Sequence, residues 1–136
     1  MFDHDGRRGS RLLSELGFKP GQLRIWQKQL AYPDYLREIA RHKIVLQLDT
    51  SFVPGQVAGD ALLCRVPCVG GNGAIDRLGF PETSGFAREI GEVGAIASRL
   101  LNDGKFYQAM VAKLVSSATK ILGFQAVSRQ LGEFFK

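Results

Sequence analysis

The clearest chemical signal in the sequence is a helix start that could hold an anion. Pro54-Gly55 leads into a helix predicted from Gln56 to Cys64, and the backbone N–H groups of a helix's first turn have no acceptor within the helix. Those groups lie at the positive end of the helix dipole, which attracts phosphate. Asp60 follows one turn later, where its carboxylate could accept hydrogen bonds from a ribose diol. This pattern predicts a nucleotide-binding loop.

A second loop, Gly70-Gly71-Asn72-Gly73, is the most glycine-rich stretch of the chain. Its residues can reach positive φ, which suits either a tight turn or a phosphate-facing nest of N–H groups. It is not a Walker loop, because no Lys-Ser or Lys-Thr follows. It is also not a full dinucleotide fingerprint, because Asp76 stands where the third glycine of G-x-G-x-x-G would be. The loop therefore supports a ligand site only in combination with the first one.

Hydrophobic periodicity predicts the elements that position these loops. Lys43 to Leu48 is a short apolar run, typical of a strand buried on both faces of a parallel sheet. The full set is strands over 22–27, 43–48 and 67–69, helices over 10–16, 33–42, 56–64 and 82–102, and closing helices after Asp103-Gly104 that break at Gly123. This order predicts an α/β fold, a three-layer Rossmann-like domain with a parallel sheet and two or three C-terminal helices.

One such domain accounts for all of residues 1–136, because the chain has the length of a single core. In open parallel sheets the ligand crevice lies beyond the carboxyl ends of the strands. Both loops follow strands, the first from Asp49 to Gly55 and the second from Gly70 to Phe80. The fold therefore predicts that they share one edge of the sheet.

The charge and cysteine patterns limit the classes of ligand and partner that the chain is expected to bind. The chain has eighteen Lys and Arg residues and thirteen Asp and Glu residues, which gives a formal net charge of +5. Because acids are interleaved with bases, we expect a slightly basic surface and no nucleic-acid partner, while a phosphate-bearing ligand or an anionic membrane surface fits the charge. Cys64 and Cys68 have neither C-x-x-C nor zinc-ligand spacing, so no metal or cofactor is expected.

No apolar run reaches the roughly 20 residues of a membrane-spanning helix, and the first residues carry acids where a signal peptide has an apolar stretch. These features predict a cytoplasmic protein. The positive charge leaves open a peripheral contact with the inner face of the membrane.

The segment from Pro54 to Gly71, PGQVAGDALLCRVPCVGG, resembles the donor-binding signature of GT-B glycosyltransferases of the "glycosyl transferases group 1" type. In that family a glycine-led loop opens a helix with an acidic residue followed by Ala. A Val-Pro dipeptide then leads into a strand and a loop of small residues. The remaining elements, including Leu-Leu-Asn-Asp at 100–103, follow in the family's order. The resemblance implies the C-terminal domain that binds a nucleotide-diphosphate sugar, with a UDP-, GDP- or ADP-sugar as donor substrate of a hexosyltransferase.

The resemblance also implies roles for individual residues. The backbone of Gly55, Gln56 and Val57 matches the segment that meets the diphosphate, and Asp60 stands where the family usually has a Glu that binds the ribose hydroxyls. No catalytic residue is assigned, because Phe52 occupies the position where the family commonly has another Glu, near the transferred sugar. The other residues predicted to bind the nucleotide sugar are Ser51, Pro54, Gly70, Gly71 and Asn72.

Two functions follow from this comparison. The first is the donor-binding half of a glycosyltransferase, which needs an acceptor lobe absent from this chain. The alternative is a non-catalytic nucleotide-binding or protein-interaction module on the same scaffold. In the family the final helix crosses to the other lobe. The apolar residues Val127, Leu131, Phe134 and Phe135 therefore predict either contact with an N-terminal acceptor-binding lobe or self-association through this helix.

Overall fold

A computed structural model describes residues 28–136 and single positions before them, namely Arg11, Glu15, Gly17, Lys19, Gly21, Gln22, Arg24 and Trp26; the side chains of 117–119 are not described. The chain forms two compact units, Met1–Tyr32 and Pro33–Lys136. The predicted helix over 10–16 and the predicted strand over 22–27 lie largely outside the described residues. Of those described, Gln22 is in a turn, and Arg24 and Trp26 are in no strand.

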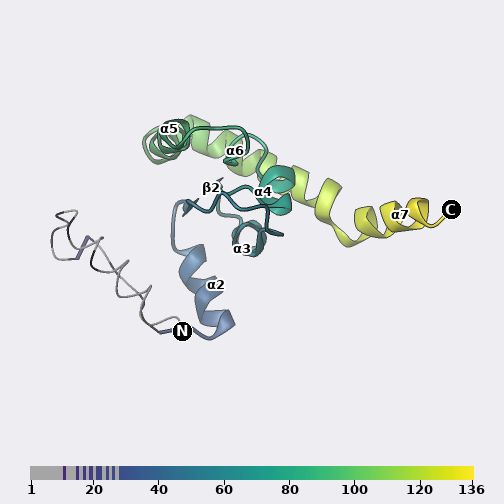
Figure 1. The fold of residues 1–136 in the computed structure, drawn as a ribbon, viewed down its shortest axis with the longest axis horizontal. Helices are drawn as coiled ribbons and strands as arrows, with labels where there is room; N and C mark the ends of the chain where they lie inside the picture. Colours follow the sequence, from purple (N-terminus) through teal and green to yellow (C-terminus); the bar gives the residue numbers. More distant parts are fainter. Residues whose placement is uncertain are drawn as a thin grey trace. The chain divides into compact units, whose positions relative to one another are not determined.

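The second unit is mostly helical (Figure 1). The helix predicted over 33–42 is present, and the predicted break at Gly123 separates the closing helices. The helices are α2 Tyr32–Ala40, α3 Gln56–Leu63, α4 Ala74–Gly79, α5 Ile90–Asn102, α6 Gly104–Ser117, the π-helix η1 Ala118–Leu122 and α7 Phe124–Phe134.

The sheet consists of two parallel strands, β1 Val45–Gln47 and β2 Cys68–Gly70, joined by α3. Val45 is opposite Cys68, and Gln47 is opposite Gly70. The strand–helix–strand order predicted between 43 and 69 is therefore confirmed. Parallel pairing also places the ends of both strands at one edge of the sheet.

The prediction of a three-layer Rossmann-like domain is wrong. Among the described residues the sheet has only these two strands of three residues each, and helices dominate the fold. The prediction that residues 43–48 form a strand buried on both faces is also wrong, because Leu46 is 50% exposed. An apolar run signals burial only when neighbouring strands and helices surround it, and β1 has a strand on one side alone among the described residues.

Within the described part of the chain, two apolar clusters form the core, and β2 contributes to both. Cys68 packs with α3 and α6 residues, whereas the next residue, Val69, packs with α5 and α6, because successive side chains of a strand point to opposite faces. Figure 1 shows α3 and the α5–α6 pair on opposite sides of β2. The first cluster is Ala58, Ala61, Cys68, Phe80 and Leu114, and the second is Val69, Val93, Ala97, Leu100 and Met110.

The helix predicted over 82–102 begins later, and a short helix was missed before it. α4 starts after Gly73, whose N–H donates to the Asp76 carboxylate at 3.0 Å. α5 starts after Glu89, whose N–H donates to Glu92 at 2.8 Å. In both cases a carboxylate three residues into the helix accepts from the capping residue, which fixes the helix start. Turns occupy the region between Phe80 and α5.

Replacing Leu100 with Ala should lower the free energy of unfolding by about 2–5 kcal/mol, because the fully buried side chain would leave a cavity in the second cluster. Its neighbour Leu101 is 47% exposed, so Leu101→Ala is the matched control and should cost less than about 1 kcal/mol. Urea denaturation measures both values. Equal losses in the two variants would contradict the assigned core.

Candidate functional site

A hollow of about 330 Å³ lies at the carboxyl ends of β1 and β2. Its walls come from the segments that follow the two strands and from the approach to α5. The lining residues are Gln47, Leu48, Asp49, Thr50, Gly70, Gly71, Asn72, Gly85, Arg88, Ile90 and Val93. This is the edge at which parallel sheets commonly bind ligands.

The structure brings some of the predicted site residues to this hollow and leaves others outside it. Gly70, Gly71 and Asn72 line it. Gln56 lies exposed at the start of α3, where the capping residue Gly55 has φ 89° and no side chain caps the helix. The predicted residues that do not line the hollow are Ser51, Pro54, Gly55, Gln56, Val57 and Asp60.

Asp60 lies inside the protein, with only 5% of its surface exposed. Burial, and then the nearby Asp60 carboxylate, raises the pKa of the Tyr35 phenol of α2. The same two causes, in the same order, raise the pKa of the Cys64 thiol at the end of α3. The carboxylate predicted to bind a ribose therefore has buried or half-buried groups of α2 and α3 as its neighbours.

The glycine-rich loop encloses a carboxylate of its own chain. Asp76 is 1% exposed, and its oxygens accept hydrogen bonds from the Gly73 N–H and from Gln47 Nε2, each at 3.0 Å. A Cβ at Gly55, Gly71 or Gly73 would lie 2.8, 2.2 or 2.8 Å from a carboxylate oxygen. The loop thus has glycines where Asp76 comes too close for a side chain, and burial raises the pKa of that carboxyl.

The two predicted loops are held together by backbone hydrogen bonds. The N–H groups of Ala74 and Ile75, in the first turn of α4, donate to the carbonyls of Val53 and Pro54 at 3.2 and 3.1 Å. The start of α4 therefore has acceptors from the first loop. As a result, the loop that leads into α3 is attached to the loop that lines the hollow.

Charge and hydrogen-bonding groups are unevenly distributed in the hollow. Arg88 is half-buried and donates to the carbonyl of Ser84. The Asp49 carboxylate accepts from the Ser51 N–H at 2.8 Å, and its hydrogen bonds with Ser51 lower its pKa. The lining thus contains one guanidinium and one carboxylate.

Asn72 leaves a hydrogen-bonding atom without a partner in the lining. Its Nδ2 donates to the Thr50 carbonyl at 3.2 Å, whereas its buried Oδ1 accepts no hydrogen bond from the residues that the structure describes. Buried polar atoms are normally paired, so an unsatisfied acceptor here points to a donor from bound water or from a ligand. Together with the Arg88 guanidinium, this oxygen suits a ligand that combines an anionic group with a hydroxyl or N–H group.

Arg88 was missed by sequence analysis. Residues 82–102 were assigned to one helix, which would have placed Arg88 on a helix surface. The turns that follow Phe80 bring it instead to the carboxyl ends of the strands. Pro81 and the Ser84-Gly85 pair are turn-forming residues that could have signalled this break.

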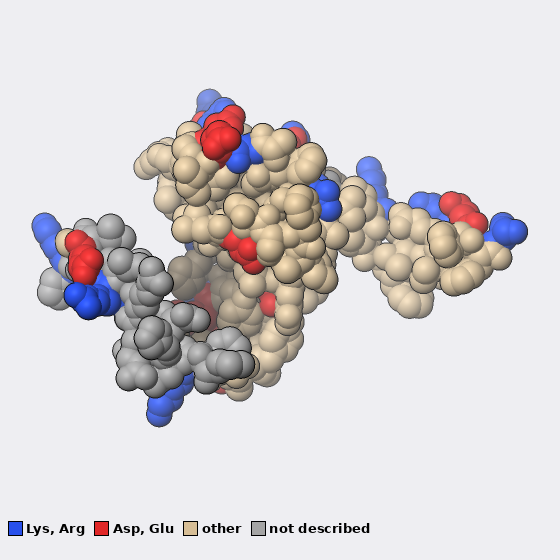
Figure 2. Space-filling view, viewed as in Figure 1, with Lys and Arg blue, Asp and Glu red and all other residues tan. Residues whose placement is uncertain are grey.

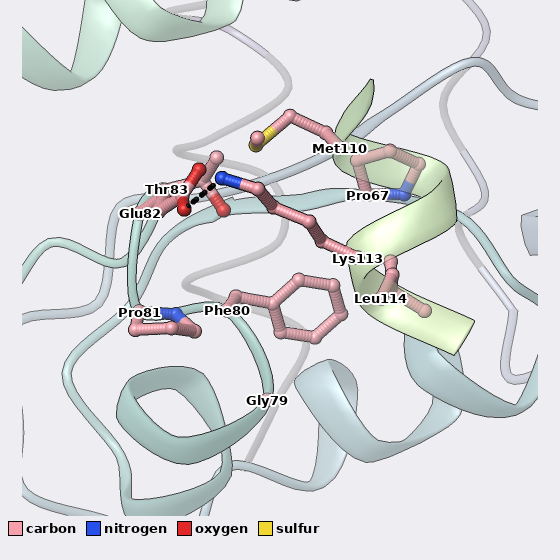
Figure 3. A pocket seen from close by; sticks show the side chains of 9 residues that line it. All are labelled: Pro67, Gly79, Phe80, Pro81, Glu82, Thr83, Met110, Lys113 and Leu114. Atoms are coloured by element: carbon pink, nitrogen blue, oxygen red, sulfur yellow. Dashed lines mark hydrogen bonds and ion pairs between the residues drawn. The ribbon is translucent and has the colours of Figure 1, made fainter. Parts of the chain in front are cut away.

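A second cavity, of about 440 Å³, has a different character (Figure 3). Phe80, Met110 and Leu114 give it apolar walls, and Lys113 pairs with Glu82 at 2.5 Å beside it. Since these two charges neutralise each other, the cavity offers apolar contact and little electrostatic attraction. None of the predicted site residues lines it.

The surface and the comparisons add further findings. On the face shown in Figure 2, basic and acidic side chains are dispersed among uncharged ones. No helix in the described part of the chain is long and apolar enough to cross a bilayer. Across the same residues, no group of three or more His, Cys, Asp or Glu side chains is arranged to hold a metal ion.

No family model, curated protein or solved structure matched the sequence.

Replacing Gly71 with Ala should destabilise the protein by at least about 2 kcal/mol, because its φ of +70° disfavours a side chain and the new Cβ would lie 2.2 Å from Asp76 Oδ1. Gly94→Ala is the matched control. Gly94 lies within α5 with open space around it, so this change should stabilise the fold by about 0.5–1 kcal/mol. Chemical denaturation of both variants provides the check. Similar stability in the two would show that Asp76 does not require the glycine.

Proposed function

We propose that this chain binds a nucleoside-diphosphate sugar at the carboxyl ends of β1 and β2, as the donor-binding half of a glycosyltransferase. The observation that carries the proposal is the composition of the hollow. The Arg88 guanidinium and the unpaired Asn72 Oδ1 lie in one lining. The guanidinium can bind a diphosphate through charge-assisted hydrogen bonds. The Asn72 oxygen can accept a hydrogen bond from a hydroxyl of the sugar or the ribose.

The neighbouring loop supports the same ligand. Gln56 is exposed at the start of α3, and no side chain caps this helix. Its approach, Val53-Pro54, is hydrogen-bonded to the first turn of α4, and α4 in turn follows the loop that lines the hollow. In this proposal the diphosphate accepts hydrogen bonds from N–H groups at the start of α3 and from the Arg88 guanidinium, which precedes α5.

UDP, GDP or ADP at about ten times its dissociation constant should raise the Tm by about 5 °C, because binding to the folded state alone adds about 1.4 kcal/mol of stability. Differential scanning fluorimetry of the full chain measures the shift, and calorimetric titration gives the affinity. If none of these nucleotides shifts the Tm at millimolar concentration, the proposal fails.

Substitution of Arg88 by Gln should weaken diphosphate binding at least about tenfold, because a charge-assisted hydrogen bond contributes about 1.5–3 kcal/mol. Arg99→Gln is the matched control, since Arg99 belongs to α5 and pairs with Asp103 outside the hollow. It should leave the affinity unchanged. An equal loss in the two variants would indicate a general effect of net charge rather than a contact with Arg88.

One observation favours the non-catalytic alternative. Phe52 is 76% exposed in the loop after β1, at the position where the resembling family commonly has a Glu. A phenyl ring cannot accept a hydrogen bond from a sugar hydroxyl or stabilise positive charge at an anomeric carbon. Under this alternative the chain binds the nucleotide but transfers no sugar.

One activity measurement tests both functions, because neither predicts sugar transfer by the chain alone. With saturating UDP-, GDP- or ADP-sugar, the chain alone should release no free nucleoside diphosphate above the uncatalysed rate, because it has no group in the place of that Glu. A coupled assay for nucleoside diphosphate reports this release. Turnover by the isolated chain would contradict both the need for an acceptor lobe and the non-catalytic alternative.

A further inference from the structure

α7 exposes its apolar side to solvent. Phe124 and Phe134 are 88% and 81% exposed, and Phe135, which caps the helix, is 79% exposed. Val127 and Leu131 between them are also exposed, whereas Ala126 is buried. Amphipathic helices normally bury this side. We call Phe124, Val127, Leu131, Phe134 and Phe135 the α7 stripe.

The stripe is narrow and continuous. At about 100° per residue, its members fall within an arc of about 100° around the helix. They occupy positions i, i+3, i+7, i+10 and i+11, the spacing with which one helix packs against another. Single exposed apolar residues need no explanation, but a contiguous patch of this kind marks a contact surface.

The charges around α7 favour a protein partner over a lipid surface. Arg129, Glu133 and Lys136 lie roughly 150–170° from the centre of the stripe by the same helical geometry. The residues that flank the stripe, Ser128 and Gln130, are uncharged. Helices that lie in an anionic membrane interface carry Lys and Arg on their polar face to reach the headgroups. Here Glu133 offsets one of the two basic residues on that face, Arg129 and Lys136, which leaves a net charge of only about +1 to attract such a surface.

The order of side chains along the stripe is self-complementary. Aromatic rings lie at both ends and aliphatic residues in the middle. An antiparallel pair of helices centred on residue 129 would place Phe124 against Phe134 of the partner subunit and Val127 against Leu131 of the partner subunit. This arrangement meets the requirement of a two-fold interface, in which the same patch serves both subunits.

The exposed area is sufficient for such a pair. Since an aromatic side chain buries about 150–250 Å², the stripe would bury roughly 600 Å² per subunit, or about 1,200 Å² in total. This is the lower end of the range for stable protein–protein interfaces. We propose that the α7 stripe is the interface of an antiparallel homodimer of this chain.

The first test is the mass of the full chain in solution. Sedimentation equilibrium between about 1 and 100 µM should show a monomer–dimer equilibrium, as expected for an interface of this size. Leu131→Glu should raise the dimer dissociation constant at least about tenfold, because it buries an unpaired carboxylate. Phe52→Gln removes a comparably exposed apolar side chain outside α7 and should leave the dimer intact. Circular dichroism confirms that each variant is folded.

A mixing experiment tests the antiparallel register. Val127→Glu and Leu131→Lys should each be monomeric alone. An equimolar mixture should form a heterodimer, because the introduced carboxylate then faces the introduced ammonium while the second contact keeps its native Val and Leu. A parallel pair would oppose identical positions and would give no such rescue.

Three results would overturn the proposal. One is a wild-type chain that is monomeric over the whole concentration range. Another is a dimer that Leu131→Glu leaves unchanged, since its interface would then lie elsewhere. The third is binding of the monomeric chain to vesicles of phosphatidylserine and phosphatidylcholine that Leu131→Glu abolishes, because the stripe would then be covered by lipid.

Discussion

The hydrogen bonds of the Asp76 carboxylate hold the candidate site together. This buried group accepts from the backbone of the glycine-rich loop and from Gln47 at the end of β1, and it caps the start of α4. Those contacts join a strand end, a loop and a helix start, each of which contributes to the hollow or to the loop beside it. Because a buried carboxylate without partners would be costly, the surrounding backbone is tightly constrained.

This constraint explains why glycines gather in the sequence where they do. Gly55, Gly71 and Gly73 all approach the same carboxylate too closely for a Cβ. From the sequence alone, a run of glycines is compatible with a turn, with a phosphate nest or with close packing. The structure shows close packing around an internal anion. The proposed external anion would therefore contact Arg88 in the hollow and the exposed start of α3.

Local patterns predicted the central strand–helix–strand segment correctly, because the apolar runs at β1 and β2 and the helix between them are each encoded within a few residues. The extent of the sheet could not be predicted in this way. Leu46 is an apolar residue in an apolar run, which is typical of a buried strand, yet it is half exposed. Burial depends on the neighbouring elements rather than on the strand itself. Of the hollow's lining residues, Asn72 belongs to a loop that the sequence singled out, whereas the position of Arg88 depends on turns that helical periodicity concealed.

The exposed apolar residues at β1 and α7 have a common physical origin. Both elements carry the periodicity of buried structure, one in Leu46 and Leu48 and the other in the α7 stripe, and both leave much of that apolar surface in contact with water. At about 25 cal/mol per Å² of apolar area, covering about 1,200 Å² contributes about 30 kcal/mol before the costs of association, which offset most of it. Since α7 carries most of the exposed aromatic area, association through α7 would gain more from the hydrophobic effect than strand pairing along β1.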